Sequence, residues 1–553
     1  MFRFSKLLIV PALVAALCAP AVRADTRTVC TITVNSPDEK HTFRRYLPAD
    51  DYRFVELVEH GRPDWLASAC RAGVRCDVLV ISGHFDDGTQ FYSDRPDVRE
   101  SLPVEALEHA SCSNACPGVF SQLKEVYLFG CNTLNADALH SATAEIRRSL
   151  VRSGHPQEDV ERITRLIDER HRDSNRDRMR SIFKDVPVIY GFSSKAPLGA
   201  TAGPLLERWF QSGAASEVAS GRASARLLGL FGPTSMVATS GMTDAEPNAG
   251  YRAQSCRFVD DRVATGDKVR FVHTLLDGEM AEVRMFLEPI EKLAASLDAR
   301  ARATPAVAAA LHDIARDARA RERYLAFARD ADEPATRARM IALAGELGWL
   351  SKSQQHAETV RMIEERLASS AITPADVDLV CTLNRDGDFD ADLPSLRVAG
   401  AHASKVPQAA LLACLGSAAS RARVLQALTS PQDADVQMAQ VYLRHRPIVD
   451  PAELRVIAAG ITRMTGDDAQ IRALDTLARQ QVNDRQSLEA LADLFPQARS
   501  IGVQRAIAGI LIRSDYRSIA RPELVRLLRE RRLKSPDGED VIDVLVRRMQ
   551  ASS

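Results

Sequence analysis

The first half of the chain alternates between two patterns of apolar residues. Short runs rich in β-branched and aromatic residues, bounded by turn residues, predict buried strands at 29–34, 53–57, 77–82, 125–130 and 186–191. Stretches with helical spacing between them predict helices at 63–72, 103–109, 136–152 and 202–212. This alternation predicts an α/β domain over residues 25–230, in which helices cover both faces of a sheet.

The second half has only the helical pattern. From about residue 267 to 553, Ala, Leu, Arg and Glu dominate, and no strand alternation is seen. Three similar segments begin at Val436, Ile471 and Val503, which are 35 and 32 residues apart. This spacing favours a solenoid of helical pairs resembling HEAT repeats, and a non-repetitive helical bundle is the alternative. Residues 231–266, rich in Gly, Pro and other turn residues, predict a linker between the two halves.

Two of the predicted strands end in reactive side chains. His84 follows the strand at 77–82, and Cys131 follows the strand at 125–130. The helix predicted between these strands makes them a parallel pair. Because functional groups gather beyond the carboxyl ends of parallel strands, we expect His84 and Cys131 to form a nucleophile–base pair.

The chemistry of such a pair requires a thiolate. An ordinary thiol has a pKa near 8.5, so it needs an imidazole or a helix N-terminus to become a good nucleophile. The helix after Cys131 is expected to begin near Asn135 or Asp137, which are both good N-caps. Asp86 or Asp87 would orient the imidazole, or would be plain turn residues. The alternative for the pair itself is an inert core cysteine and a turn histidine.

The N-terminus has the pattern of a secretory signal over residues 1–24. Arg3 and Lys6 precede an apolar stretch at 7–18, which is too short to span a bilayer, and small residues around Ala24 offer a cleavage site. We therefore expect a periplasmic or secreted protein with no transmembrane span in the mature chain. The formal net charge is −1, and loss of the three basic residues of the signal lowers it to near −4, so nothing favours nucleic-acid binding.

Cysteine usage fits an oxidising compartment. Of the ten cysteines, Cys18 lies in the signal, and nine remain. An odd number leaves one thiol over, and we expect this to be Cys131. Cys112 and Cys116 are close enough in sequence to form a disulfide. A zinc site is the competing interpretation, but the paired spacing of zinc ligands is absent, so no metal or other cofactor is expected.

A polar stretch at 154–185 separates the predicted helix at 136–152 from the strand at 186–191. Its many charged residues favour an exposed helix or surface loop. The alternative is an insert that is open to proteolysis.

Three blocks of the first half resemble the caspase-like cysteine peptidases, and within them the CHAT-type branch. Leu79–His84 is similar to the histidine strand of that family, and Val126–Thr133 to its cysteine strand. Val188–Lys195, followed by the helix at 202–210, is similar to the next strand and helix. His84 precedes Cys131 by 47 residues, in keeping with a caspase histidine about 50 residues upstream of its cysteine.

The resemblance implies a cysteine endopeptidase that acts on a protein or peptide substrate, with Cys131 as the nucleophile and His84 as the general acid and base. It also implies that the backbone N–H groups of Phe85 and Cys131 hold the oxyanion. The family usually has glycine where this chain has Phe85, which would remove conformational freedom and open space. The alternative function is therefore a catalytically inactive caspase-like module that serves as a cell-envelope interaction scaffold. In either case the helical half would dock a protein partner.

Overall fold

The chain folds into two compact units, Met1–Ala310 (unit 1) and Leu311–Ser553 (unit 2). The computed structural model describes residues 26–57, 65–85, 88–93, 100–113, 116–137, 147–148, 150–151, 154–170, 174–396, 405–480, 482–534 and 540–550. The predicted signal at 1–24 lies outside these residues, as does most of the predicted helix at 136–152.

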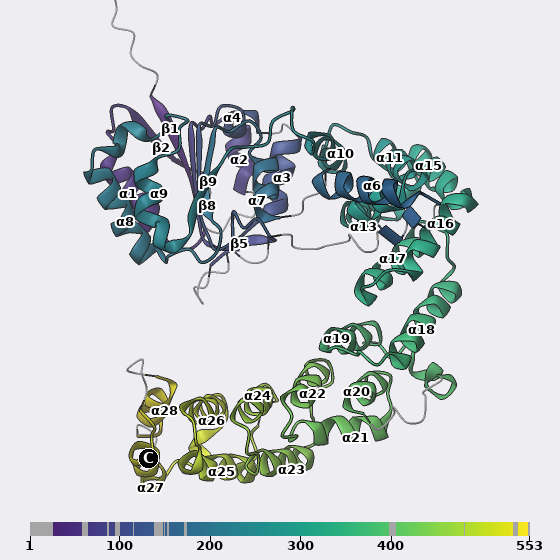
Figure 1. The fold of residues 1–553 in the computed structure, drawn as a ribbon. Coiled ribbons are helices and arrows are strands. Elements are labelled where there is room, and N and C mark those ends of the chain that lie inside the picture. Colours follow the sequence, from purple (N-terminus) through teal and green to yellow (C-terminus); the bar gives the residue numbers. More distant parts are fainter. Residues whose placement is uncertain are drawn as a thin grey trace, which may run out of the picture. The chain divides into compact units, whose positions relative to one another are not determined.

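Unit 1 is built on a six-stranded mixed sheet (Figure 1). Its strands are β1 (Arg27–Thr33), β2 (Tyr52–Glu56), β3 (Val78–Ser82), β7 (Glu125–Phe129), β8 (Val188–Phe192) and β9 (Met236–Thr239). The order is β2-β1-β3-β7-β8-β9, and the first five strands are parallel. They confirm the five predicted strands to within two residues at each end. β9 runs antiparallel to β8 and was not predicted.

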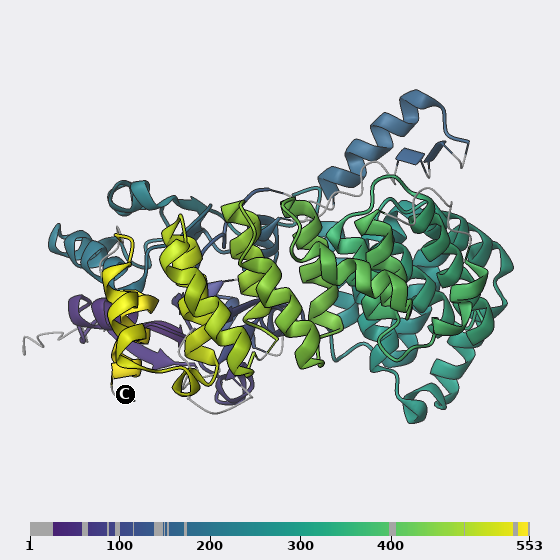
Figure 2. The ribbon, with the colours of Figure 1, turned by 90° about the horizontal axis from the view of Figure 1, so that it is seen from below.

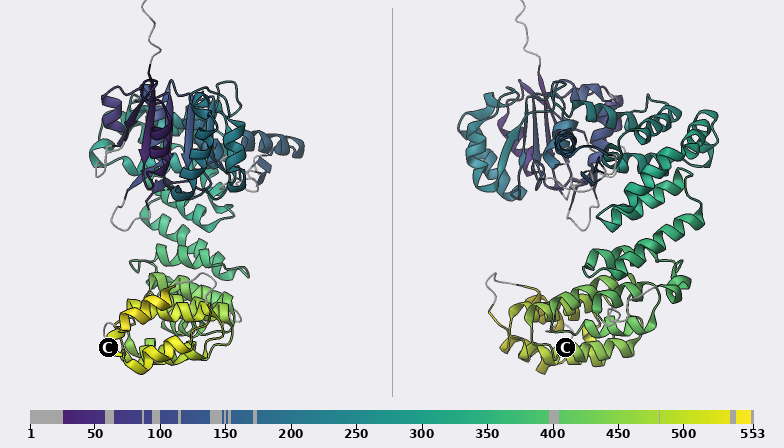
Figure 3. Two further views of the ribbon diagram at one scale, coloured as in Figure 1. Left: turned by 90° about the vertical axis from the view of Figure 1, so that its left-hand side faces the viewer. Right: turned by 45° about the vertical axis from the view of Figure 1, so that its right-hand side comes forward.

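Helices cover both faces of this sheet, as the sequence predicts (Figures 1 and 3). One face carries α1 (Asp38–Tyr46), α8 (Gly199–Gln211), η1 (Ala214–Glu217), α9 (Ala225–Phe231) and η2 (Gly232–Thr234). The other carries α2 (Trp65–Arg71), α3 (Val104–Cys112), α4 (Pro117–Phe120) and α7 (Asn175–Ile182). The alternation along β3 shows why two layers are needed: Val78 and Val80 pack in one core, and Leu79 and Ile81 in the other.

A second, antiparallel sheet interrupts the predicted strand–helix–strand unit. It consists of β4 (His84–Phe85), β5 (Gln90–Tyr92) and β6 (Ser101–Pro103), and lies between β3 and α3 in the chain. The prediction missed it because strands of two or three residues are too short to show a periodic pattern. Its consequence for the site is that His84 belongs to a strand and not to a free turn.

The predicted linker at 231–266 is wrong. Besides β9, it contains most of α10 (Ala249–Val259), whose Cys256 forms a disulfide with Cys112 of α3. The following helices to residue 310 also belong to unit 1, so the all-helical unit begins later than the predicted residue 267. They are α11 (Thr265–Asp277), α12 (Met280–Met285), α13 (Leu287–Ser296) and α14 (Ala299–Arg302). The Gly and Pro residues here form turns between short elements, which composition alone does not distinguish from a linker.

The polar stretch at 154–185 is also more than an exposed insert. It forms α6 (Gln157–Arg170), which contacts α10, and α7, which packs against α3. Met179 and Ile182 of α7 are buried in the core beneath the sheet. The charged residues of α7 are also partly buried, because Asp177 is 6% exposed and Arg178 pairs with Glu108 of α3. The high content of charged residues in α7 therefore does not mark it as exposed.

Unit 2 is all-helical in its described residues. Its helices are α15 (Pro305–Arg316, which spans the division), α16 (Ala318–Arg329), α17 (Pro334–Glu346), α18 (Lys352–Ala368), α19 (Pro374–Leu383), η3 (Asp390–Ser395), α20 (Val406–Cys414), α21 (Ala418–Ala427), α22 (Asp433–His445), α23 (Pro451–Ile461), α24 (Asp467–Leu477), α25 (Arg485–Leu494), η4 (Phe495–Gln497), α26 (Ile501–Arg513), η5 (Tyr516–Ser518), α27 (Pro522–Glu530) and α28 (Val541–Gln550). α19, α22, α24, α26 and α28 form one row, in which each helix contacts the next, and α23 and α25 pack in a second layer (Figures 1 and 2).

Four disulfides tie the described cysteines together. They join Cys30 to Cys76, Cys70 to Cys116, Cys112 to Cys256 and Cys381 to Cys414. The suggested Cys112–Cys116 pair is therefore wrong, because Cys112 ends α3 facing α10, whereas Cys116 precedes α4 and faces α2. Among the described cysteines only Cys131 is free, which confirms the residue expected to be left over.

Candidate active site

His84 and Cys131 lie at the same edge of the large sheet. β3 and β7 are adjacent and parallel, with Ser82 paired to Phe129, and the N–H of Gly83 donates to the Phe129 carbonyl at 3.1 Å. Each reactive residue comes two positions beyond this last pair. Since neighbouring strands are about 4.8 Å apart, the two chains deliver His84 and Cys131 side by side at the carboxyl edge.

Both residues line one cavity of about 40 Å³. Segments that follow β1, β3, β7 and β8 contribute to it. Its lining residues are Asn35, Ser36, Glu39, Ser82, Gly83, His84, Phe129, Gly130, Cys131, Ala196, Pro197, Leu198 and Gly199. The sequence therefore predicted two of its reactive groups, and the fold adds a third, Glu39.

Cys131 is half-buried, and its thiol is held by the loop after β8. The N–H of Ala196 donates to Cys131 Sγ at 3.3 Å, a contact that strengthens when the sulfur is a thiolate. Asn132 turns the chain with a φ of 58°, in the left-handed region that Asn tolerates, and its N–H donates to the Ser194 carbonyl at 2.7 Å. The turn that presents the sulfur is thus fastened to the loop that supplies its hydrogen bond.

The second half of the polar stretch supports this turn from the other side. Asn175 donates from Nδ2 to the Asn132 carbonyl at 3.0 Å, and the N–H of Arg176 donates to the Asn135 carbonyl at 3.0 Å. Asn175 is itself buried. The start of α7 is therefore part of the structure that positions Cys131, a role that the sequence analysis did not assign to it.

The small sheet positions His84. His84 pairs with Tyr92 across β4 and β5, and the two rings lie 5.5 Å apart. Arg178 of α7 donates to the Gly88 carbonyl at 2.7 Å and forms an ion pair with Glu108 of α3, which anchors Gly88, four residues after the histidine. Asp86 and Asp87, the candidates for orienting the imidazole, lie outside the described residues.

Phe85 occupies the position where the resemblance implies glycine, and the fold accommodates it. Its φ is not among the positive values of the described residues, so the backbone there needs no glycine. The side chain is buried in the core and packs on Phe91 with ring centroids 4.7 Å apart. Phe85 is not among the residues that line the cavity, so its ring does not occupy the space beside Cys131.

The position that does require a glycine is Gly130, directly before Cys131. A Cβ at Gly130 would lie 2.9 Å from Phe85 Cβ and 3.1 Å from the Gly83 carbonyl oxygen. We expect Gly130→Ala to destabilise unit 1 by about 2 kcal/mol, because the Phe85 backbone must shift. Denaturant unfolding of this variant measures the loss. Gly229→Ala, on α9 with open space around its Cβ, is the matched control and should be neutral or slightly stabilising. An unchanged Gly130→Ala protein would contradict this packing.

The helix N-terminus at the cavity is a different one from that expected. The helix predicted to follow Asn135 or Asp137 falls mainly on residues outside those described. Gly199, the first residue of α8, lines the cavity together with the preceding segment from Ala196. The partial positive charge at the start of α8 is therefore available to a negative group in this cavity.

Glu39 is the acid that sequence analysis missed. It lies in the first turn of α1, which follows β1 at the same edge of the sheet, and its exposed fraction is 2%. Burial raises the pKa of Glu39 from 4.5 to about 7; its own backbone N–H and Ser36 oppose the shift, and Asp38 adds to it. Its Oε2 accepts no hydrogen bond from the described residues. Its position shortly after the predicted strand at 29–34 is the sequence feature that could have identified Glu39 as a candidate site residue.

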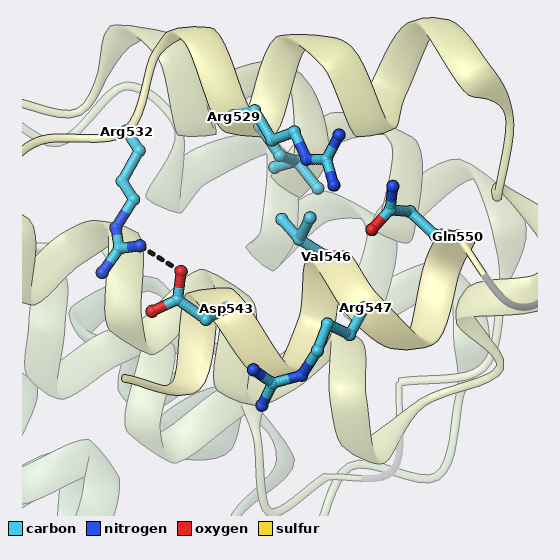
Figure 4. Close-up of a pocket in the computed structure, with 7 residues that line it drawn as sticks. Arg529, Arg532, Asp543, Val546, Arg547 and Gln550 are labelled. Atoms are coloured by element: carbon cyan, nitrogen blue, oxygen red, sulfur yellow. Dashed lines mark hydrogen bonds and ion pairs between the residues drawn. The ribbon is translucent and has the colours of Figure 1, made fainter. Parts of the chain in front are cut away.

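Two larger cavities lie in unit 2, and neither contains a cysteine or a histidine. The first, about 480 Å³, lies between α27 and α28 and is lined by Arg529, Arg532 and Arg547 among others, with Arg532 paired to Asp543 (Figure 4). The second, about 450 Å³, is lined by residues of α22, α24 and the segments after them. The cavity that holds Cys131 and His84 therefore remains the candidate active site, although it is smaller.

Other kinds of site are not seen in the described part of the chain. It contains no group of three or more His, Cys, Asp or Glu side chains placed to hold a metal ion. None of its helices combines the length and the apolar character that crossing a membrane requires.

Comparison with known proteins returned no match among family models, curated proteins or solved structures.

Proposed function

We propose that this chain is a periplasmic or secreted caspase-like cysteine endopeptidase, with Cys131 as the nucleophile and His84 as the general acid and base. The observation that carries the proposal is that the free cysteine shares a cavity with a histidine at adjacent ends of two parallel strands. A structural core cysteine would need neither a position in a cavity nor a neighbouring imidazole.

In this mechanism His84 takes the proton of the Cys131 thiol, and the sulfur attacks the carbonyl carbon of the scissile peptide bond. The N–H group of Cys131, which lines the cavity, would hold the developing oxyanion. Phe85, the second donor implied by the resemblance, is not among the lining residues. His84 then returns the proton to the leaving amine, and a thioester links the acyl half of the substrate to Cys131. Water, deprotonated by His84, hydrolyses the thioester and restores the thiol. The Ala196 N–H and the start of α8 stabilise the thiolate before attack.

The arrangement of the three family-like blocks supports the caspase-like assignment. They fall on β3, β7 and β8, which are consecutive neighbours in the sheet, and the helix of the third block is α8. Phe85, the main departure from the family pattern, is packed in the core. An inactive module would not require this particular set of groups to converge on one cavity.

The remaining parts of the proposal rest on composition and architecture. Four disulfides favour an oxidising compartment, in agreement with the signal pattern at 1–24. The rows of helices in unit 2 favour HEAT-like repeats, whose extended surfaces suit protein partners. Unit 2 would therefore dock a partner or substrate protein, while unit 1 performs the cleavage.

A thiol-reactive acyl probe tests the nucleophile–base pair directly. We expect the folded protein to be labelled at Cys131, as located by peptide mass spectrometry, and the labelling rate to fall by at least about 100-fold in His84→Ala. Circular dichroism of both proteins shows that the fold is kept. Labelling that is equally fast in both proteins would contradict the pair, and it would leave the inactive scaffold as the better description of the chain.

A further inference from the structure

The cavity beside Cys131 contains an acid that the mechanism above does not use. Resting on the proposed function, we propose that Glu39 binds the positively charged side chain of a lysine or arginine on the amino side of the cleaved bond. The side chain of that residue lies next to the scissile carbonyl, and so next to the nucleophile. Glu39 lines the same cavity as the nucleophile, so it lies where that substrate side chain would bind.

The hydrogen bonding of Glu39 leaves a place for a cation. Oε2 accepts no hydrogen bond from the described residues although the side chain is 2% exposed. A buried acceptor without a partner costs free energy, and a buried carboxylate costs more. An ammonium or guanidinium group that donates to Oε2 would remove both costs, and an apolar or acidic side chain would remove neither.

The charge of the cavity also favours a basic substrate side chain. None of the thirteen residues that line it is lysine or arginine. Lys40, next to Glu39 in sequence, is engaged with Glu56 at 2.9 Å. An acidic substrate side chain would therefore face Glu39 with no lysine or arginine beside it among the described lining residues, which electrostatic complementarity disfavours.

The size of the cavity limits what reaches Glu39. At about 40 Å³, the cavity has room for only a few water molecules. This volume accepts the charged end of a side chain and not a whole aromatic ring. The aliphatic part would lie along Pro197 and Leu198 at the rim, where Leu198 is 65% exposed and offers apolar surface.

Kinetics with matched fluorogenic peptides test this assignment. The peptides differ only at the residue before the cleaved bond, which is lysine, arginine, uncharged norleucine or aspartate. We expect the kcat/KM of the wild-type protein to be about 100-fold higher for lysine or arginine than for norleucine, and Glu39→Gln to reduce this ratio to below about 10. Glu207→Gln, on α8 but outside the cavity, should keep the wild-type ratio.

Binding to a Cys131→Ala protein separates this inference from the proposed function. We expect an amidated peptide that ends in lysine to bind this protein about 100-fold more tightly than the norleucine peptide does, and Glu39→Gln to remove the difference. If that binding is found but no peptide is cleaved by the wild type, the peptidase proposal fails and the acidic subsite stands. A preference for aspartate, or equal binding of the lysine and norleucine peptides, would overturn the subsite.

Discussion

Cys131→Ala is expected to abolish peptide hydrolysis, and His84→Ala to lower kcat/KM by about 1,000-fold or more. Without the sulfur no acyl-enzyme forms, and without the imidazole neither the thiol nor the leaving amine has a proton-transfer partner. Cleavage of an unfolded protein substrate, followed by mass spectrometry of the products, measures both losses whichever residue is preferred at the cleaved bond.

The control for His84→Ala is His109→Ala. His109 is a histidine of the same unit, 42% exposed, whose Nε2 contacts Asp261 at the surface and which does not line the cavity. Its loss should leave kcat/KM unchanged. Hydrolysis that survives in Cys131→Ala would exclude this cysteine as the nucleophile, whatever happens in His84→Ala.

The sheet could be predicted because its strands are buried on both faces. A strand such as β3 must then be apolar at every position from Val78 to Ile81, and such a run is visible in a single sequence. The same logic placed His84 and Cys131 at one edge, since two parallel strands that end in reactive groups must end together. The free state of Cys131 followed from the odd number of cysteines.

Elements whose stability comes from tertiary contacts were missed. In α1 the sequence DEKHTFRRY is mostly charged, and the helix is held by the buried side chain of Phe43, so it has no clear apolar period. β9 exists because β8 offers an unpaired edge, and its four residues carry too little pattern of their own. Glu39 was overlooked with α1, because a lone acid among charged residues looks like a solvated surface residue.

The disulfides and the role of Phe85 could not be derived for a related reason. Which cysteines pair depends on how α3, α4 and α10 are placed, and neighbours in sequence such as Cys112 and Cys116 face different helices. Whether a phenylalanine can replace glycine at position 85 depends on the direction of its side chain. That direction is toward Phe91 and the core, in space that glycine at position 130 leaves open.

We expect the stability of the Glu39→Gln protein, relative to that of the wild type, to increase as the pH rises. Burial raises the pKa of Glu39 from 4.5 to about 7 in the folded protein, so between these values the native state binds a proton that the unfolded chain has lost. The stabilisation from this proton is complete below about pH 4.5 and is lost as the pH rises through 7. The shift corresponds to about 3 kcal/mol, and glutamine, which does not titrate, escapes the loss.

Hydrogen exchange of the β7 amides reports the opening of unit 1. It therefore measures the stability of Glu39→Gln and of the wild type at pH 4.5 and at pH 8. Glu246→Gln is a control of opposite sign in the same unit. Burial acts to raise the pKa of Glu246, but the Thr243 N–H and Arg180 outweigh it and lower the pKa. The stabilisation from Glu246 is therefore present above its unfolded pKa and is lost as the pH falls. If Glu39→Gln and the wild type kept the same stability difference at both pH values, Glu39 would already be ionised and paired, and the cavity would lack the free acid on which its proposed selectivity depends.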